Sequence, residues 1–371
     1  MRTVSFFPTR LVTALTAAGC LAFTGCSSLA QTNAPELSAS PRGSTASVHG
    51  DADDPAIWIH PTDAARSVVI GTDKSSSRGG LFVWDLAGTQ LQYIPLRHPN
   101  NVDLRRNVNV DGRVVDIVAV NLRPERQIKV YEINPANGWL TDITTTNGMH
   151  TPELKQPYGF CLYRRPGDGA LFAIESSASS SRGQKNLFQY RLHGDGAGRM
   201  QATFVRVIGT NTIKSVAEGL VADDELGHLY ASDESKAVRK YRVDPDAGDD
   251  ALVTSFALPG EGIRGDREGL AIYKCADGTG YLLLSSQGSG TVKVYRREGE
   301  PGEPHRHPLL ATIKTTGSTQ TDGLDVTSSA AGTNFPSGFI IKHNARKKNF
   351  ALYSWEDAAQ SFLKICVDGE R

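Results

Sequence analysis

Oxygen-bearing side chains recur along this chain, and each one opens a short apolar run. Six residues begin these runs at separations of 47, 57, 60, 50 and 54 positions: Asp54, Asn101, Tyr158, Glu218, Glu268 and Asp322. Four of the six are acidic, and more acids stand nearby, including Asp103, Asp266 and Asp325. Carboxylates brought together either take up protons or share a cation. Hard oxygen ligands without paired His or Cys favour Ca²⁺ over Zn²⁺, so the pattern predicts a calcium site.

Basic residues occupy a second shared position in the first three repeats. They follow the second apolar run of each repeat: Lys74 with Arg78, then Arg123, then Arg182 with Lys185. A single Lys or Arg is usually a solvated surface residue, so the shared position is what indicates a function. Cations beside metal-binding carboxylates suit a multiply anionic substrate, and phosphate fits best.

A second repeat of the same period identifies the elements that must position these residues. Six short runs end in an aromatic residue: Trp84, Tyr131, Tyr190, Tyr241, Tyr295 and Tyr353. Another apolar run precedes each of them, and a weaker one follows, such as Leu91–Leu96 and Phe362–Val367. Four antiparallel strands in each of six units predict an all-β fold, a six-bladed β-propeller. Its inner strands start at one mouth of a central channel, which would bring the six leading residues together.

The charge balance argues against one class of partner, and the first residues predict export. The 40 basic and 40 acidic residues balance, which argues against a nucleic-acid partner. Residues 1–25 carry two Arg and the apolar stretch Leu11–Phe23, as export signals do. Cys26 followed by two Ser is typical of a bacterial lipoprotein, and ordinary secretion with later cleavage is the alternative. We expect either a lipid-anchored envelope protein or a periplasmic or secreted one.

The remaining boundaries follow from composition. Residues 26–47 are rich in Ser, Ala, Thr and Pro and predict a flexible linker, which leaves 48–371 as the propeller domain. Three cysteines lie beyond the signal: Cys161, Cys275 and Cys366. Because they are odd in number and sparse, we expect small buried hydrophobes rather than a disulfide framework.

Seven runs in order resemble the β-propeller phytases, from about Asp51 to Trp355. They are Asp53-Asp-Pro-Ala-Ile-Trp58, Asn100-Asn-Val-Asp103, Tyr158-Gly-Phe160, Glu218-Gly-Leu-Val-Ala-Asp-Asp-Glu225, Glu268-Gly-Leu270, Ser285-Ser-Gln-Gly288 and Thr321-Asp-Gly-Leu-Asp325. The resemblance implies a calcium-dependent phosphomonoesterase of the 3-phytase type acting on phytate, myo-inositol hexakisphosphate. We expect a monomer.

The resemblance also implies roles for individual residues. The implied ligands of several calcium ions are Asp54, Asn101, Asp103, Tyr158, Glu218, Asp266, Glu268, Asp322 and Asp325. Lys74 and Arg123 fall where the family binds phosphate. The chain departs from the family at Lys74-Ser75, where a Lys pair is usual, and Arg78 is the expected substitute. A Ser-rich loop, 176–181, replaces the Lys of the third blade, with Arg182 and Lys185 nearby, and His343-Asn344 replaces Gln-Asp.

These residues predict hydrolysis by a calcium-activated water that attacks phosphorus in line. Glu218 would orient the water, while Lys74 and Arg123 would neutralise the transferring phosphoryl group. One alternative is a calcium-dependent propeller lactonase or esterase, which would not need the basic residues. Another is a non-catalytic binding propeller, which would not need converging carboxylates.

Overall fold

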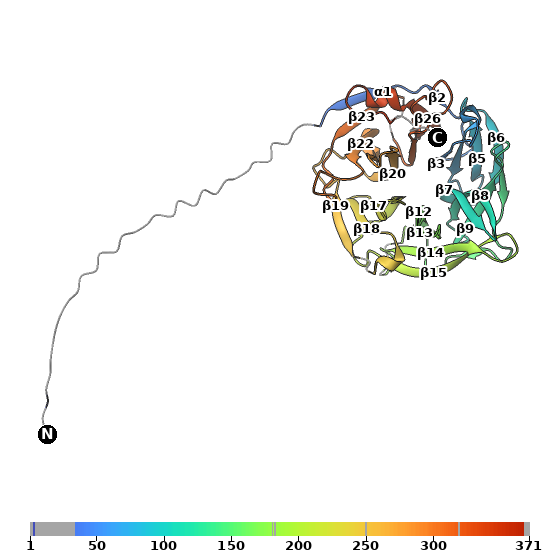
Figure 1. The fold of residues 1–371 in the computed structure, drawn as a ribbon, viewed down its shortest axis with the longest axis horizontal. Coiled ribbons are helices and arrows are strands. Elements are labelled where there is room, and N and C mark those ends of the chain that lie inside the picture. Colours follow the sequence, from blue (N-terminus) through green and yellow to red (C-terminus); the bar gives the residue numbers. More distant parts are fainter. Residues whose placement is uncertain are drawn as a thin grey trace. The chain divides into compact units, whose positions relative to one another are not determined.

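Short strands separated by Gly-, Asp- and Pro-containing turns fold into six mainly antiparallel sheets, which are arranged in a ring around the axis of the predicted channel (Figure 1). The computed structural model describes Thr3 and residues 34–179, 181, 183–248, 251–317 and 320–366. These sheets confirm the predicted six-bladed propeller. The predicted signal 1–25, Cys26 and Arg182 lie outside the described residues, apart from Thr3.

Each blade runs from an inner strand at the channel to an outer strand at the rim. The inner strands are β3 (Ala52–Trp58), β7 (Pro99–Val110), β12 (Pro157–Arg164), β16 (Ala217–Asp223), β20 (Arg267–Lys274) and β24 (Leu324–Thr327). The second strands are β4 (Val68–Asp73), β8 (Arg113–Leu122), β13 (Leu171–Ser177), β17 (His228–Asp233), β21 (Gly280–Ser286) and β25 (Phe339–Asn344). The third strands are β5 (Gly80–Asp85), β9 (Gln127–Ile133), β14 (Leu187–Gly194), β18 (Ala237–Arg242), β22 (Thr291–Arg296) and β26 (Asn349–Ser354).

The outer strands are shorter and more varied. Five blades end in β6 (Gln90–Pro95), β10 (Leu140–Asp142), β15 (Met200–Ile208), β19 (Leu252–Phe256) and β23 (Ala311–Thr315). The short strand β11 (Met149–His150) also pairs with β9. Three 3₁₀ turns, Ala64–Arg66, Pro245–Ala247 and Gln287–Ser289, lie between strands.

The N-terminal segment closes the ring. Strand β2 (Gly43–Ser44) pairs with β26 as the outer strand of the sixth blade, and β1 (Glu36–Ala39) pairs in parallel with β23 of the fifth. The linker prediction is therefore wrong for these residues. The strand predicted at Phe362–Val367 is also wrong, because residues 362–366 form no strand. A two-residue strand has no periodicity of its own, so only its partner strand could reveal it.

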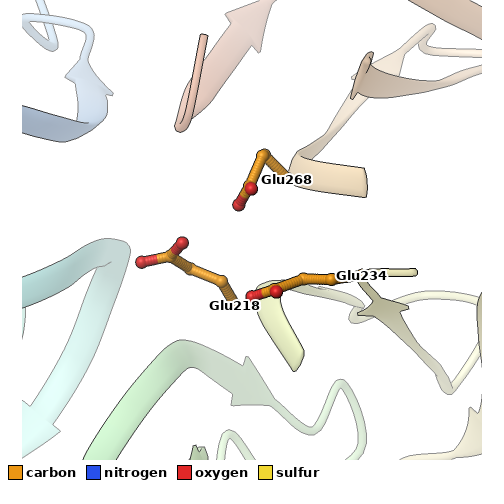
Figure 2. A group of neighbouring side chains, drawn as sticks. All are labelled: Glu218, Glu234 and Glu268. Atoms are coloured by element: carbon orange, nitrogen blue, oxygen red, sulfur yellow. The ribbon is translucent and has the colours of Figure 1, made fainter. Parts of the chain in front are cut away.

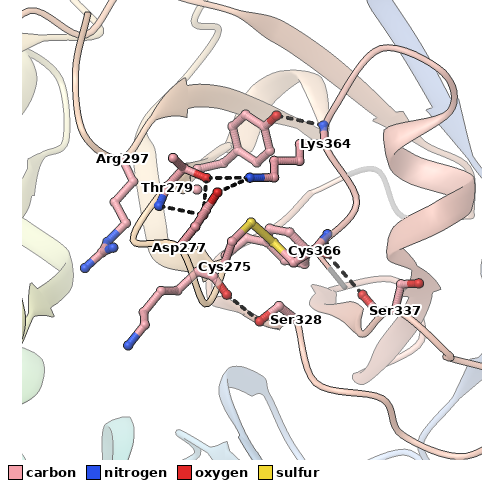
Figure 3. The surroundings of a disulfide bond; sticks show 12 residues. Cys275, Asp277, Thr279, Arg297, Ser328, Ser337, Lys364 and Cys366 are labelled. Carbon is pink, nitrogen blue, oxygen red and sulfur yellow. Dashed lines mark hydrogen bonds and ion pairs between the residues drawn. A yellow bond between two sulfur atoms is a disulfide. The ribbon is translucent and has the colours of Figure 1, made fainter. Parts of the chain in front are cut away.

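The C-terminal segment is fastened to the fifth blade. Helix α1 (Trp355–Ala359) begins with Trp355, whose ring stacks on that of Tyr273 at 3.7 Å. Beyond it, Cys366 forms a disulfide with Cys275 (Figure 3). The prediction of small buried hydrophobes holds for the free, buried Cys161 and is wrong for this pair. The 91 positions between the two cysteines hid their proximity.

The core fills the spaces between adjacent blades. One apolar cluster joins Val69 and Trp84 of the first blade to Ile341 and Phe350 of the sixth. The six aromatic residues of the second repeat are at most 2% exposed, so they pack between sheets. No helix among the described residues is long and apolar enough to cross a membrane.

Candidate active site at the upper mouth of the channel

The six inner strands all start at one end of the channel, which we call the upper mouth. The glycine that follows the leading residue lets adjacent strands approach there. A Cβ at Gly219 would collide with the carbonyl oxygen of Glu268, and one at Gly323 with the side chain of Asp54. The repeated Gly is thus explained by close packing of neighbouring blades.

Three glutamates converge at the upper mouth. The carboxylate oxygens of Glu218, Glu234 and Glu268 lie within 4.8 Å of one another, and Figure 2 shows the three side chains around one space. Glu218 and Glu268 are 5% and 3% exposed. They come from the inner strands of the fourth and fifth blades, as predicted. This group is suited to a hard cation.

Sequence reasoning missed Glu234. It directly follows β17, the second strand of the fourth blade, just as Lys74 follows β4 and Arg123 follows β8. Its position is the signal that could have identified it: every second strand ends at the mouth where the inner strands start, so an acid directly after β17 lies there as a cation would.

Residues of the second and third blades hold the carboxylate of Glu218, which belongs to the fourth. Asn100 donates from Nδ2 to Oε1 at 2.9 Å, and the Tyr158 hydroxyl donates to Oε2 at 2.9 Å. Arg123 joins the same network: its Nη1 donates to Asn100 Oδ1 at 3.2 Å, and its guanidinium lies 5.1 Å from the Tyr158 ring centre. A predicted substrate cation therefore shares two partners with a predicted metal ligand.

The glutamates repel one another in the absence of a cation. Burial, and then the charge of Glu218, raise the pKa of Glu234 to about 8 and hold the pKa of Glu268 well above its usual range. Among the described residues, Glu268 Oε2 and Glu234 Oε1 are buried without a hydrogen-bond partner. Oxygen atoms in this state fit a divalent cation, which would satisfy both and restore their charge.

Lys74 already neutralises a second pair of acids at this mouth. Its Nζ lies 2.7 Å from Asp53 Oδ1 and 3.1 Å from Asp322 Oδ2. Burial opposes the charge, but these acids keep the pKa of Lys74 above its usual value. Asp322 is held further by Gln287 Nε2 at 3.0 Å, and its backbone N–H donates to His343 Nδ1 at 2.9 Å.

The other predicted residues occupy different positions. Asp266 is half-buried, and its charge contributes to the raised pKa of Glu234, so it borders the cluster. Arg78 is exposed and donates to the carbonyl of His49 at 3.3 Å. Lys185 donates to the carbonyl of Lys214 at 2.7 Å. Among the described residues, neither Arg78 nor Lys185 forms a hydrogen bond or ion pair with the acids of the mouth.

Deeper in the channel, predicted ligands line a cavity of about 40 Å³: Asp54, Asn101, Asp103 and Asp325. All three of these aspartates also join neighbouring blades. Asp54 accepts from Val102 N at 3.0 Å, Asp103 from Leu162 N at 2.8 Å and Asp325 from Ile57 N at 2.8 Å. The cavity has room for about one water molecule or one ion.

The fold and the upper mouth together define a β-propeller protein with a cluster of three acids beside two basic residues. A sequence model of the Phytase family matches residues 9–368. The 3-phytase of Bacillus subtilis (strain 168) is 35% identical over 319 residues, which cover 83% of this chain and 80% of that protein. The chain belongs to the phytase family.

Two solved structures are similar at 13% identity, each with a TM-score of 0.48. One is a luciferin-regenerating enzyme, matched over 87% of this chain and 97% of that chain. The other is the hydrazine synthase of Kuenenia stuttgartiensis, matched over 80% of this chain and 82% of that chain.

Proposed function

We propose that the upper mouth is a calcium-dependent active site that releases phosphate from phytate. Membership of the phytase family makes the chain a phosphomonoester hydrolase of the 3-phytase type. The observation that carries the calcium dependence is the cluster of Glu218, Glu234 and Glu268, whose close carboxylates have no cation partner among the described residues.

The proposed ligands fall into two groups. At the mouth they are Glu218, Glu234 and Glu268, with Tyr158, Asp266 and Asp322 at its border. In the 40 Å³ cavity they are Asp54, Asn101 and Asp325. When bound, calcium would lower the pKa of a water molecule and offset charge on the phosphoryl group.

The protein's own residues would bind and orient the reactants. Glu218 is fixed from both sides by Asn100 and Tyr158, so its carboxylate is pre-positioned to accept a hydrogen bond from the attacking water. Arg123 and Lys74 would bind phosphate oxygens and counter the charge of the transition state. Lys74 stays charged because Asp53 and Asp322 stabilise its ammonium form.

Phosphate release from phytate, measured against calcium concentration in metal-stripped protein, tests this function. We expect no turnover without calcium and saturable recovery with it. The melting temperature should rise over the same calcium range, because the ion relieves carboxylate repulsion. If excess EDTA altered neither turnover nor melting temperature, calcium dependence would be wrong.

We also propose that the protein is exported. The Cys275–Cys366 disulfide supports this, because such bonds persist in oxidising compartments. Lipid attachment at Cys26 is the finer proposal. Replacing Cys26 with Ala should move the protein from the membrane fraction to the soluble fraction, whereas unchanged fractionation would exclude the anchor.

A further inference from the structure

One arginine in the lower part of the channel bonds to carboxylates of two blades. Arg105, on the inner strand β7 of the second blade, is 16% exposed. Its guanidinium donates to both carboxylate oxygens of Asp103, each at 3.0 Å, and to those of Asp224 at 2.9 and 3.2 Å. Asp224 follows β16 of the fourth blade, so the arginine links two blades that are separated by the third.

Backbone oxygens complete the surroundings of this guanidinium. It donates to the carbonyls of Leu104 at 2.8 Å, Ala222 at 3.5 Å and Leu162. With the four carboxylate oxygens, seven oxygen atoms surround one cation. Ca²⁺ in proteins takes six to eight carboxylate and carbonyl oxygens, so this set matches it in ligand type and number.

Asp103 has no acceptor capacity left for a metal ion. Its Oδ1 accepts from Leu104 N at 2.7 Å and from Arg105, and its Oδ2 accepts from Leu162 N and from Arg105. An ionised carboxylate has about four acceptor positions, and all four are used here.

Other nearby cations are engaged elsewhere. Arg297 pairs with Asp223 and Glu225, Lys274 pairs with Glu225, and Arg106 pairs with Asp116. Arg105 is the cation that contacts both Asp103 and Asp224 among the described residues.

We infer that Arg105 fills, with its own guanidinium, an oxygen cage in the lower channel that would otherwise bind a calcium ion. Asp103 is then a partner of Arg105 rather than a metal ligand. Bound ions are confined to the upper mouth and the cavity below it. This inference rests on the proposal that the channel binds calcium, and it concerns how many ions bind and where.

Calorimetric calcium titration of metal-stripped Arg105→Ala protein tests the inference. We expect one more bound calcium than in the wild type. In the absence of calcium the variant should melt at a lower temperature, and either calcium or millimolar guanidinium should restore it, because each replaces the lost charge. Arg106→Ala is the matched control: Arg106 is the next residue and is 43% exposed, and its loss should change neither quantity.

Arg105→Gln keeps some hydrogen bonding without the charge and provides a second variant if the alanine folds poorly. Unchanged calcium stoichiometry in a folded variant would overturn the inference. So would failure of both variants to fold at any calcium or guanidinium concentration. These readouts do not depend on phosphate release, so a wild type that fails to hydrolyse phytate would count against the proposed function alone.

Discussion

The two ends of the channel are both rich in acids, but only one end supplies enough cations. At the lower end, Asp223 and Glu225 pair with Arg297, and Asp103 and Asp224 with Arg105. At the upper mouth Lys74 pairs with Asp53 and Asp322, whereas Glu218, Glu234 and Glu268 face one another. We infer that the acids paired with arginine at the lower, matched end stabilise the ring, and we propose the unpaired acids at the upper, unmatched end as the position for a metal ion.

The largest expected effect comes from changing the unmatched end. Glu218→Gln keeps the shape of the side chain but removes the charge that would bind calcium and orient water. We expect kcat on phytate at saturating calcium to fall by about 10²–10⁴-fold, the usual range for loss of a general base. Steady-state phosphate release measures this.

Glu225→Gln is the matched control at the lower end, where the carboxylate contacts Lys274 and Arg297. It should leave kcat nearly unchanged. A Glu218→Gln enzyme with full activity, or equal losses in the two variants, would remove the functional distinction between the ends.

The next effect is on stability and belongs to the matched end. Arg297 is 1% exposed and holds Asp223 through two bonds of 2.6 Å, which join the fifth blade to the fourth. Arg297→Met leaves a buried carboxylate unpaired, so we expect unfolding free energy to fall by about 3–5 kcal/mol. Chemical denaturation measures the loss, and kcat of the folded fraction should be retained.

Two further variants sharpen this second test. Arg106→Met removes an exposed pair with Asp116 and should cost less than about 1 kcal/mol. Adding Asp223→Asn to Arg297→Met should recover part of the lost free energy of unfolding, because the buried, unpaired carboxylate is then removed. If Arg297→Met and Arg106→Met lowered the free energy of unfolding equally, the buried pair would not be an important link between the blades.

A third effect separates the two ends by pH. In the metal-free protein burial and Glu218 raise the pKa of Glu234 to about 8, well above its value in an unfolded chain. The raised pKa stabilises the fold fully below about pH 4.5, and that contribution is lost as pH rises through about 8. The melting temperature of metal-free protein should therefore fall across this window.

Calcium should remove that slope, because a bound cation favours the ionised carboxylates. Glu234→Gln should also reduce the slope in metal-free protein. At the lower end burial raises the pKa of Glu225, but Lys274 and Arg297 outweigh it, so its pKa lies below the usual value. Its contribution is present above about pH 4.5 and is lost in acid. If plots of melting temperature against pH had the same slope with and without calcium, this contrast between the two ends would be wrong.

These same residues separate what the sequence could predict from what it could not. The repeats predicted the blades because burial on both faces leaves continuous apolar runs in strands such as β4 and β21. They also placed Glu218 and Glu268 at one mouth. They did not distinguish Asp103 from those glutamates, because pairing with Arg105 depends on where the side chains lie across the channel.

Two other features depended on contacts between segments far apart in the chain. Gly43–Ser44 becomes a strand only because β26 offers it a free edge. The Cys275–Cys366 disulfide joins a turn after β20 to a segment beyond α1. Neither feature has a local sequence pattern. Two residues that form a short strand, or one cysteine that forms a disulfide, have the same local sequence as they would have in an ordinary loop.

The smallest expected effects concern the cations predicted to bind substrate. Arg123 shares Asn100 and Tyr158 with Glu218, so its guanidinium is held at the mouth. Arg123→Ala should raise KM for phytate by about 10-fold or more, as expected for loss of one charge-assisted hydrogen bond. Lys185 instead donates to the Lys214 carbonyl, so Lys185→Ala should raise KM by about 2-fold at most. A larger effect from Lys185 than from Arg123 would mean that phytate extends over the third blade, and the unmatched glutamates alone would not define the site.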